Sequence, residues 1–279
     1  MKKISRRSFL AAAGLSVAAL ALTACGGSSA STASSVASSA ASSEAASTSA
    51  AAGELTTVEA GKLTMATNAA FPPYEMTTDA GEFEGIDIET AQAIADKLGL
   101  ELQIDDMDFD AALLSVQQGK ADIVMAGVTV TDERKAVMDF SDSYATGIQS
   151  IIVPEGSDIA SPDDLAGKMI GTQRGTTGYI YCSDDFGDDN VVAYDDGLTA
   201  VQALNNGQVD AVVIDNAPAQ EFIAANPGLK ILDTSYAEED YAIGMAKGSS
   251  LEDAVNAALK ELKADGTLQS IVDKYITAE

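Results

Sequence analysis

Residues 87–105, DIETAQAIADKLGLELQID, decide the fold class because they contain a helical pattern followed at once by a strand pattern. Apolar residues recur at helical spacing from Ala91 to Leu98, which predicts an amphipathic helix from the start of this stretch to Leu98. Gly99 stands where a helix C-cap is expected, because glycine adopts the left-handed conformation that ends many helices. Residues 100–105 then alternate apolar and polar side chains, as half-buried strands do.

The same alternation of strands and helices continues on both sides of this stretch. Residues 62–67 show a second half-buried strand pattern, and residues 123–126 and 212–214 are continuous apolar runs suited to buried strands. Another helical pattern begins at Phe109 and ends before Gly119. Strand–helix–strand order implies mostly parallel sheets covered by helices, with a ligand cleft near the strand C-terminal ends. A chain of 279 residues built in this way favours two lobes.

Three further helices are predicted from their N-terminal signals. Ser161 and Pro162, followed by two aspartates, combine an N-cap, a proline at the first helical position and acids in the first turn. Pro218 is expected to open a second helix. Ser250 is expected to cap a long C-terminal helix with an apolar stripe on one face.

The first 24 residues are expected to be an export signal rather than part of the fold. Paired arginines at positions 6 and 7 precede an apolar run that ends at Leu22. The run is short for a membrane span but suits the hydrophobic region of a signal peptide. The Leu-Thr-Ala-Cys sequence that ends at Cys25 resembles the lipobox of bacterial lipoproteins, which implies that Cys25 is lipidated and becomes the new N-terminus. The paired arginines resemble a Tat signal, with Sec export as the open alternative.

A tether and a single further cysteine follow. Residues 26–53 are almost only Ser, Ala, Thr and Gly, and such a segment lacks the large apolar residues that offset chain entropy. We therefore expect residues 25–53 to form a lipidated, disordered tether that holds the protein at the outer face of the cell membrane. Cys182 has no second thiol to pair with, so no disulfide framework is expected. It is predicted to be an inert, half-buried small apolar residue.

The charge and the missing histidine exclude several functional classes. The chain has 43 Asp and Glu against 16 Lys and Arg, which gives a formal net charge of −27. Nucleic-acid binding needs clustered basic residues, so no nucleic-acid partner is expected. The simplest explanation is an acidic surface that keeps an exported protein soluble and monomeric, with a cation-binding surface as the alternative. Because the chain has no histidine, Ser-His and Cys-His catalysis and His-ligated metals are excluded, and no metal or cofactor is expected.

Short motifs in the folded part occur in a characteristic order. They are Phe71-Pro72-Pro73-Tyr74-Glu75, Gly85-Ile86-Asp87-Ile88, Phe109-Asp110, Gly119-Lys120-Ala121-Asp122, Thr129-Val130-Thr131-Asp132-Glu133-Arg134, Phe140-Ser141, Gly175-Thr176-Thr177, Gly207-Gln208-Val209-Asp210-Ala211 and Asp215. In this order and spacing the chain resembles the family 3 solute-binding proteins, the polar amino-acid-binding proteins of ABC importers, over about residues 61–277. Each motif alone is weak evidence, but together in register they are specific.

The resemblance implies an α/β, bilobal periplasmic-binding-protein fold of the second topological type (type II). Lobe 1 would comprise residues 54–146 and 241–279, and lobe 2 residues 147–240. Two chain crossings, near Gly147–Val153 and Asp233–Ile243, would form a two-strand hinge. Lobes joined in this way close over a ligand by a hinge motion.

The resemblance also implies a site for the two charged groups that every amino acid carries. Arg134 matches the family arginine that grips the ligand carboxylate, a bidentate task suited to a planar guanidinium. The backbone N–H groups of Thr129 and Thr177 would complete this anion site, close to a helix N-terminus. Asp215 matches the acid that pairs with the ammonium group, together with the Gly127 carbonyl and the Thr129 hydroxyl.

The ligand side chain is expected to lie among aromatic and amide groups. Phe71 and Phe109 match the aromatic positions that sandwich the aliphatic part of the ligand. Asn68 stands where binders of basic amino acids place an aspartate, and Gln173 stands where some relatives have lysine or leucine. This neutral pair favours a polar uncharged amino acid such as glutamine, and Arg174, which would favour an acidic ligand, is expected to face outward. The remaining predicted lining residues are Ala126 and Thr176.

Several of these residues also have purely structural explanations. Arg134 could pair with a neighbouring acid on a helix surface, Asp215 could be a helix N-cap, and Phe109 could belong to the core. Tyr74, Glu75 and Tyr144 are expected at the edge of the cleft, without an assigned role.

These features together predict an extracytoplasmic, monomeric lipoprotein that captures an amino acid and delivers it to the permease of an ABC transporter. An enzyme of the same fold, such as an arogenate or prephenate dehydratase, is the first alternative, with Asp215 and Glu75 as its acid–base candidates. A carboxylate-and-ammonium clamp made by Arg134 and Asp215 fits binding better than catalysis. A sensory ligand domain is the second alternative, disfavoured because no membrane span or signalling helix is predicted after Ser250.

Overall fold

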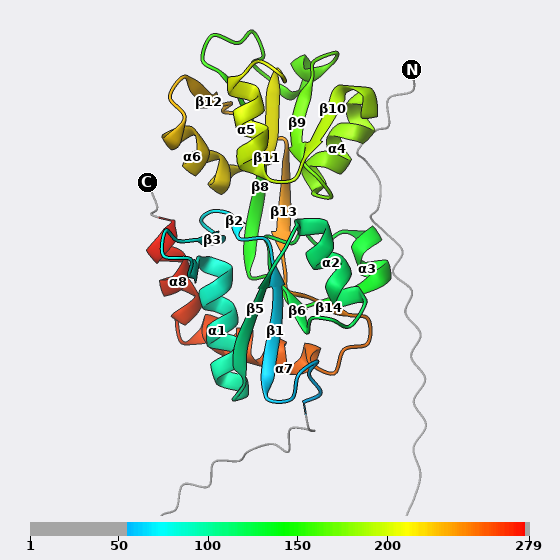
Figure 1. The fold of residues 1–279 in the computed structure, drawn as a ribbon, viewed down its shortest axis with the longest axis vertical. Helices are drawn as coiled ribbons and strands as arrows, with labels where there is room; N and C mark the ends of the chain where they lie inside the picture. The colour runs from blue at the N-terminus through cyan, green and yellow to red at the C-terminus, as the bar shows by residue number, and fades with distance from the viewer. Residues whose placement is uncertain (1–54, 277–279) are drawn as a thin grey trace, which may run out of the picture. The chain divides into compact units, whose positions relative to one another are not determined.

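Two mixed sheets covered by helices dominate residues 55–276, the part of the chain that this computed structural model describes (Figure 1). We call the region around the first sheet lobe 1 and the region around the second sheet lobe 2. The α/β class predicted from the alternation of strand and helix patterns is confirmed. The expectation of mostly parallel sheets is wrong, because four strand pairings in the two main sheets are parallel and five are antiparallel.

Lobe 1 is built on a five-stranded sheet in the order β5-β1-β6-β14-β7. Its strands are β1 (Lys62–Thr67), β5 (Glu101–Asp106), β6 (Ile123–Val124), β7 (Met138–Phe140) and β14 (Gly244–Ala246). β5 and β6 run parallel to β1, whereas β14 is antiparallel to both of its neighbours. Leu63 and Met65 of β1 pack in one apolar cluster and Ala66 packs in another, because successive side chains of a strand point to opposite faces.

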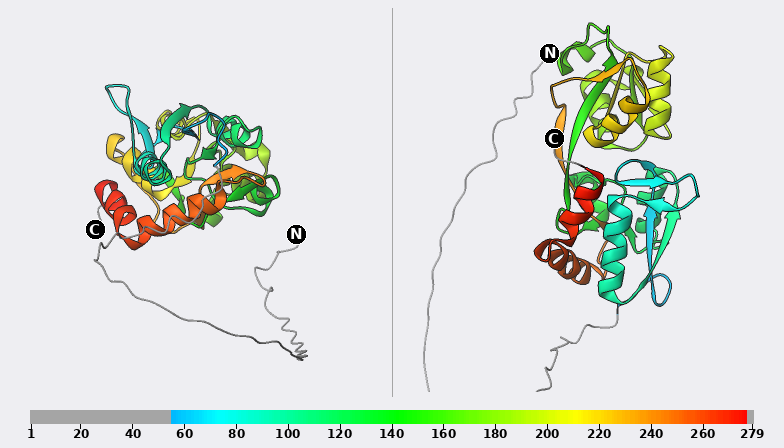
Figure 2. Two further views of the ribbon diagram at one scale, coloured as in Figure 1. Left: turned by 90° about the horizontal axis from the view of Figure 1, so that it is seen from below. Right: turned by 90° about the vertical axis from the view of Figure 1, so that its left-hand side faces the viewer.

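Helices cover both faces of this sheet. The helices of lobe 1 are α1 (Ile86–Leu98), α2 (Phe109–Gln117), α3 (Asp132–Val137), α7 (Glu252–Ala264) and α8 (Thr267–Tyr275). α1, α7 and α8 lie side by side, as two further views show (Figure 2), and α2 packs against the opposite face. α1 ends as predicted, because Gly99 adopts the left-handed conformation at φ 69° and donates its N–H to the last helical carbonyls.

Lobe 2 is built on a six-stranded sheet in which β10-β9-β11-β8-β12 are neighbours and β13 also pairs with β8. Its strands are β8 (Ala145–Pro154), β9 (Ile170–Gln173), β10 (Val191–Tyr194), β11 (Ala211–Asp215), β12 (Leu229–Ile231) and β13 (Ala237–Tyr241). Its α-helices are α4 (Thr177–Phe186), α5 (Gly197–Asn205) and α6 (Asn216–Ala225). α4 packs on one face with Cys182 in its apolar cluster, and α5 and α6 pack on the other.

Two long strands carry the chain between the lobes. β8 leads from lobe 1 into lobe 2, and β13 returns to lobe 1 and to β14. They pair antiparallel, with Ala145 opposite Tyr241 and Gln149 opposite Ala237. They lie in the two stretches where the sequence predicts the crossings, while the exact lobe boundaries stay a prediction.

A small three-stranded sheet supports one side of the site. It consists of β2 (Ala70–Phe71), β3 (Glu75–Thr77) and β4 (Phe83–Glu84). β2 and β3 pair antiparallel, and Phe71 lies directly opposite Glu75. The segment after β1 therefore presents Asn68, Phe71 and Glu75 close together.

Some helix predictions need correction. The helix expected after Ser161 is a single 3₁₀ turn, Pro162–Leu165, although the capping box at Ser161 is present. Ser250 does not cap the C-terminal helix: α7 begins after Leu251, whose N–H donates to the Ser249 hydroxyl. The C-terminal helical stretch is also two helices, because Gly266 breaks it with φ 81°.

The predictions for the N-terminal segment concern residues that the structure does not describe. The signal peptide 1–24, Cys25 and the tether 26–53 lie outside the described residues. Within residues 55–276, no helix has the length and apolar character needed to cross a membrane.

Candidate functional site

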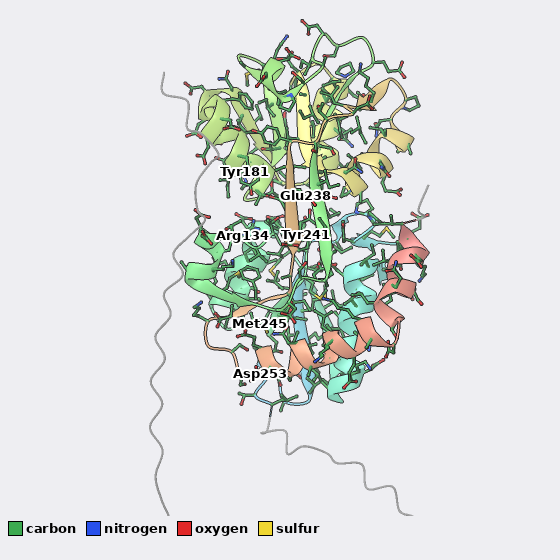
Figure 3. All side chains as sticks on the ribbon, turned by 180° about the vertical axis from the view of Figure 1, so that it is seen from behind. Arg134, Tyr181, Glu238, Tyr241, Met245 and Asp253 are labelled. Atoms are coloured by element: carbon green, nitrogen blue, oxygen red, sulfur yellow. The ribbon has the colours of Figure 1, made fainter. Side chains whose placement is uncertain are left out.

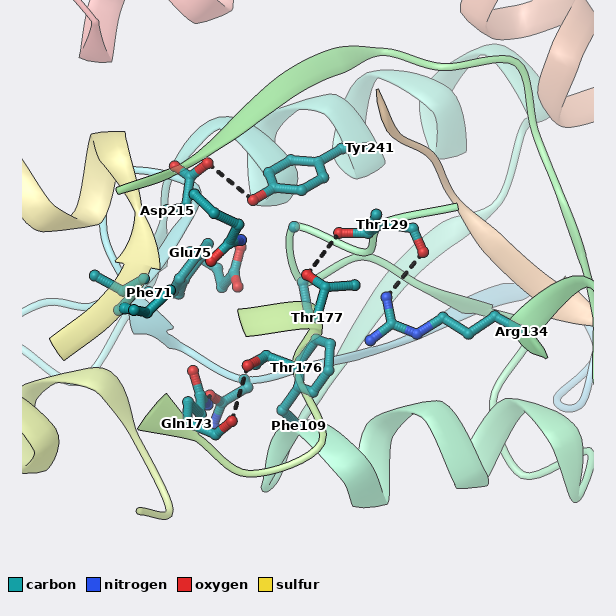
Figure 4. Close-up of a pocket in the computed structure, with 16 residues that line it drawn as sticks. Phe71, Glu75, Phe109, Thr129, Arg134, Gln173, Thr176, Thr177, Asp215 and Tyr241 are labelled. Atoms are coloured by element: carbon teal, nitrogen blue, oxygen red, sulfur yellow. Dashed lines mark hydrogen bonds between the residues drawn. The ribbon is translucent and has the colours of Figure 1, made fainter. Parts of the chain in front are cut away.

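A small pocket lies between the two lobes (Figure 4). The eleven residues that the sequence assigns to a ligand site all line it: Asn68, Phe71, Phe109, Ala126, Gly127, Thr129, Arg134, Gln173, Thr176, Thr177 and Asp215. Five further residues complete its lining: Glu75, Gln149, Val213, Ile214 and Tyr241. The geometry therefore brings the predicted residues together, and their role in binding stays a prediction.

Arg134 is the only basic residue among these sixteen lining residues. It lies in α3, whose N-terminus is capped by the Thr131 hydroxyl, and its side chain is turned into the protein with only 8% exposed. Nη1 donates to the Thr129 carbonyl at 2.8 Å and Nη2 donates to the Gly175 carbonyl of lobe 2 at 3.1 Å. The guanidinium carbon also lies 5.4 Å from the centre of the Phe109 ring. Arg134 is thus not a surface residue paired with a neighbouring acid, and Phe109 faces the pocket.

Asp215 ends β11 and is both an N-cap and a pocket residue. Oδ1 accepts the Ala217 N–H at 3.0 Å, which caps α6. Oδ2 accepts the Ile148 N–H at 2.8 Å and the Tyr241 hydroxyl at 3.0 Å. Burial raises the pKa of Asp215 to about 6, although these hydrogen bonds act against the shift. A carboxylate can accept about four hydrogen bonds, so one acceptor position remains for a ligand.

Tyr241 reaches Asp215 because β8 carries a glycine where the ring passes. A Cβ at Gly147 would come within 2.3 Å of the Tyr241 ring, so any other residue would displace it. Tyr241 comes from β13 and Asp215 from β11, and their hydrogen bond is drawn in Figure 4. Gly147 therefore places a second polar group beside the carboxylate.

The two predicted amides come from different lobes and are hydrogen-bonded directly to each other. Gln173 Nε2, from β9 in lobe 2, donates to Asn68 Oδ1, from lobe 1, at 2.8 Å. Gln173 also donates to the Asp195 carbonyl at 3.2 Å, and Asn68 Nδ2 donates to the Met107 carbonyl at 3.0 Å. The pair thus links the lobes and keeps the Gln173 side-chain carbonyl for another donor.

Glu75 is the least satisfied polar group of the pocket. Its side chain is fully buried, and no donor within residues 55–276 reaches either carboxyl oxygen. Burial and the neighbouring Asp87 carboxyl hold the pKa of Glu75 well above its usual value. Asp87 in turn accepts the Gly127 N–H at 3.0 Å, and burial raises its pKa to about 6. A buried, charged carboxylate without a partner is costly, and the raised pKa favours the neutral, protonated form of Glu75.

Glu239 lies behind the pocket wall on β13. Its Oε2 accepts hydrogen bonds from the Thr129 hydroxyl, the Thr177 hydroxyl and Gln149 Nε2, each at 3.0 Å. Burial lowers the pKa of Arg134, and the charge of Glu239 is the largest of the charges that oppose this shift. Three pocket residues from two lobes therefore share one carboxylate oxygen.

Other sequence predictions can be placed directly. Thr176 caps α4 through its hydroxyl, and Thr177 is the first residue of that helix, as the anion-site prediction requires. Arg174 is exposed, as predicted, and pairs with Asp195 at 3.5 Å. Cys182 is completely buried rather than half-buried as expected, and burial raises the pKa of its thiol to about 12.

Sequence reasoning missed Gln149, Tyr241 and Glu239 and left Glu75 without a role. Glu239 stands in the acidic run Glu238-Glu239-Asp240, which resembles a solvated charge cluster. The signal that could have identified Glu239 is the alternation of a strand. Glu239 lies two residues before Tyr241, so the two side chains share a face, and both are buried while Glu238 and Asp240 are exposed.

Comparison with known proteins gives the family. The chain matches the bacterial extracellular solute-binding proteins, family 3, over residues 63–278, a range that includes both lobes. The chain belongs to this family. It is 32% identical over 226 residues to the L-cystine-binding protein of Escherichia coli strain K12, covering 79% of this chain and 85% of that protein.

Solved structures of family members give the fold. An ancestral arginine-binding protein bound to glutamine is 41% identical, with a TM-score of 0.75 and coverage of 78% of this chain and 99% of that one. An ancestral arginine-binding protein bound to arginine is 42% identical, with a TM-score of 0.74 and coverage of 77% and 98%. The family 3 protein therefore has the predicted type II periplasmic-binding fold. It is the amino-acid-binding component of an ABC transporter and not an enzyme.

Proposed function

We propose that this family 3 protein is held at the outer face of the cell membrane by a lipid on Cys25. There it captures a polar amino acid between two closing lobes and delivers it to an ABC permease. The observation that carries the proposal is the position of Arg134 and Asp215. One comes from lobe 1 and the other from lobe 2, yet both line one pocket.

These two residues supply the opposite charges that an amino acid needs. The Arg134 guanidinium has five N–H donors, of which two bond to backbone carbonyls, so three remain for a carboxylate. Asp215 keeps one acceptor position for an ammonium group. Because each lobe contributes one charge, a zwitterion favours the closed arrangement by bonding to both.

An uncharged polar side chain is the first candidate. Asn68 and Gln173 come from different lobes, are buried, bond to each other and carry no charge. A side-chain amide could donate to the Gln173 carbonyl, whereas an aliphatic side chain would leave it without a partner, at about 1–3 kcal/mol. The ancestral relative bound to glutamine is consistent with this candidate.

A basic side chain is the second candidate, and Glu75 is the observation that favours it. A guanidinium or ammonium group would give the unpartnered Glu75 carboxyl a donor and a countercharge. The pocket lining supports this option further, since it holds two acidic residues, Glu75 and Asp215, against Arg134 alone. The ancestral relative bound to arginine is consistent with this second candidate.

Binding measurements on the mature protein test the proposal and separate the two candidates. All twenty amino acids are screened by thermal shift, and the leading ones are then measured by calorimetry. Glutamine, asparagine or serine at the top supports the first candidate, and arginine or lysine supports the second. A screen in which no amino acid raises the melting temperature contradicts the proposed function.

The lipid anchor is tested separately. Cys25→Ala should move the protein from the membrane fraction to the soluble fraction of cells, because it removes the acyl chains that hold it there. Cys182→Ala is the matched control and should leave the protein in the membrane fraction. Unchanged membrane association of Cys25→Ala would contradict the anchor.

A further inference from the structure

Glu239 belongs to no set of residues that the sequence motifs assign, yet three pocket residues converge on it. We propose that Glu239 is a positioning residue of the amino-acid site. By accepting the hydroxyl protons of Thr129 and Thr177, it turns their oxygen lone pairs toward an α-ammonium group. This inference rests on the proposed function, because it concerns how the same pocket recognises an amino acid.

The position of Glu239 follows from the alternation of β13. Glu238 and Asp240 are exposed, whereas Glu239 and Tyr241 are buried, because successive side chains of a strand point to opposite sides. Figure 3 shows Glu238 and Tyr241 along β13, with Arg134 and Tyr181 to one side of the strand. Glu239 is only 6% exposed, although its two acidic neighbours face solvent.

The hydrogen bonds of Glu239 fix the direction of two hydroxyl groups. A threonine hydroxyl has one proton to donate and two lone pairs. Thr129 Oγ1 and Thr177 Oγ1 each donate to Glu239 Oε2 at 3.0 Å, and the two hydroxyl oxygens lie 3.4 Å apart. With their protons committed to the carboxylate, both hydroxyls can only accept hydrogen bonds in the pocket. Gln149 Nε2 donates to the same oxygen at 3.0 Å and holds the carboxylate in place.

A negative charge at Glu239 strengthens this acceptor role. A hydroxyl that donates to a carboxylate becomes a better acceptor, because hydrogen bonds in a chain polarise one another. The second oxygen, Oε1, is buried and receives no hydrogen bond from the described chain. Burial and the Glu239 carboxylate together raise the pKa of Tyr181 to about 12. The carboxylate therefore contacts the pocket through Thr129 and Thr177, and its charge also acts on Arg134.

The consequence is discrimination between amino acids and compounds that lack the ammonium group. An ammonium group donates to the Thr129 oxygen and, through it, interacts with Glu239. A compound without this group leaves the threonine lone pairs without a donor. Removing the charge of Glu239 should therefore lower the affinity for amino acids more than the affinity for compounds without the ammonium group. The difference in affinity between the two kinds of ligand should then become smaller.

The test compares each amino acid with its desamino analogue in the full mature protein. The probes are L-arginine with 5-guanidinopentanoate and L-glutamine with glutaramate, measured by calorimetry or competition. For the pair that the parent protein binds, Glu239→Gln should lower the ratio of the two affinities at least tenfold. Glu238→Gln removes the same charge from the exposed face of β13 and should keep the parent ratio within twofold.

Each other outcome is decisive. An unchanged ratio in Glu239→Gln, or an equal loss for both members of the pair, would mean that Glu239 is only a structural residue. If Glu239→Gln fails to fold by circular dichroism, Glu239→Asp keeps the charge but withdraws it by one methylene. In Glu239→Asp the ratio of amino-acid affinity to desamino-analogue affinity must also fall at least tenfold. A ratio equal to that of the parent protein overturns the inference. If the parent binds neither amino acid, the proposed function itself is wrong and this inference falls with it.

Discussion

Two sides of the pocket differ in how far the protein itself satisfies their polar groups. The clamp side consists of Arg134 and Asp215, supported from behind the wall by Glu239, and each of these has two or three protein partners. The side-chain side consists of Asn68, Gln173 and Glu75. There the two amides bond mainly to each other and to backbone carbonyls, and Glu75 has no donor within residues 55–276.

This difference suggests how one fold can recognise both the carboxylate and ammonium groups that all amino acids share and the side chain that differs between them. Groups that the protein already orients need little reorganisation when a ligand arrives, so they suit the carboxylate and ammonium groups that all amino acids share. A buried group without a partner favours only ligands that supply one, because every other ligand leaves the desolvation cost in place. Specificity should therefore depend most on Glu75 and the amides, and affinity most on the clamp.

The largest effect is expected at the clamp. Arg134→Ala removes one member of a buried charge pair with the ligand carboxylate, which typically costs about 2–5 kcal/mol. Affinity for the best amino acid should fall about 30-fold to several thousand-fold, at 1.4 kcal/mol per tenfold. Arg174→Ala is the matched control, since Arg174 is an exposed arginine outside the pocket. Calorimetry that gave Arg134→Ala an affinity within threefold of the parent would remove Arg134 from the clamp.

A large but selective effect is expected at Glu75. Glu75→Gln keeps the size of the side chain but cannot ionise, so a basic ligand can no longer find a countercharge there. Affinity for arginine should fall about tenfold or more, while affinity for glutamine should change less than threefold. Glu84→Gln, on the exposed part of the same small sheet, serves as the control. Equal losses for arginine and glutamine would contradict the division between the two sides of the pocket.

An increase in pH should raise the affinity for the amino acid and lower the free energy of unfolding. Asp215 must be ionised to pair with an ammonium group, and its pKa is about 6, so affinity should rise about tenfold between pH 5 and pH 7. Asp215 and Asp87 both have a folded-state pKa above the usual 3.8. Their contribution to stability is therefore fully present below about pH 4 and is lost as the pH rises through about 6.

Two titrations test this opposition. Calorimetric affinities are measured from pH 5 to pH 8, and the free energy of unfolding in urea is measured over the same range. Asp215→Asn should lose most of the pH dependence of affinity while retaining the N-cap of α6, because asparagine also caps helices. Affinity and unfolding free energy that rose together with pH would show that the raised pKa values of Asp215 and Asp87 do not govern stability.

The smallest effect is expected from the amide pair. Asn68→Asp introduces a charge beside Gln173 and should shift the ratio of arginine to glutamine affinity severalfold, on the order of tenfold, towards arginine. Asn190→Asp, far from the pocket in lobe 2, is the control for added charge. A ratio unchanged by Asn68→Asp would mean that the amide pair joins the lobes without contributing to selectivity.

The sequence predicts local elements well, and the residues that it assigns to a ligand site meet at one pocket. The helix ending at Gly99 and the strand that follows depend on neighbouring residues, and both form as expected. The eleven residues predicted to bind the ligand, from Asn68 to Asp215, all line one pocket. Ser250 resembles a cap because it is a serine that precedes an apolar stripe, but the N-cap position of α7 is Leu251, one residue later. Cap positions one residue apart have nearly the same local signal.

The remaining part of the site depends on contacts between distant residues. Glu239 is 110 residues from Thr129 and 90 residues from Gln149, so nothing local marks it as buried. Glu75 follows a motif that identifies its segment, but its lack of a donor depends on everything packed around it. A polar residue that acts through other residues leaves no motif of its own, and only the assembled structure identifies it.

The hydrogen bond between Asn68 and Gln173 has a kinetic consequence. Together with the Arg134 bond to Gly175, it joins the two lobes across the pocket. Arg134 and Asp215 are 8% and 2% exposed, so a solute can reach them only after these bonds open. Capture should then be gated: as solute concentration increases, the observed association rate reaches a plateau set by lobe opening. The same bonds that hold the captured molecule would also limit how quickly the transporter can be supplied.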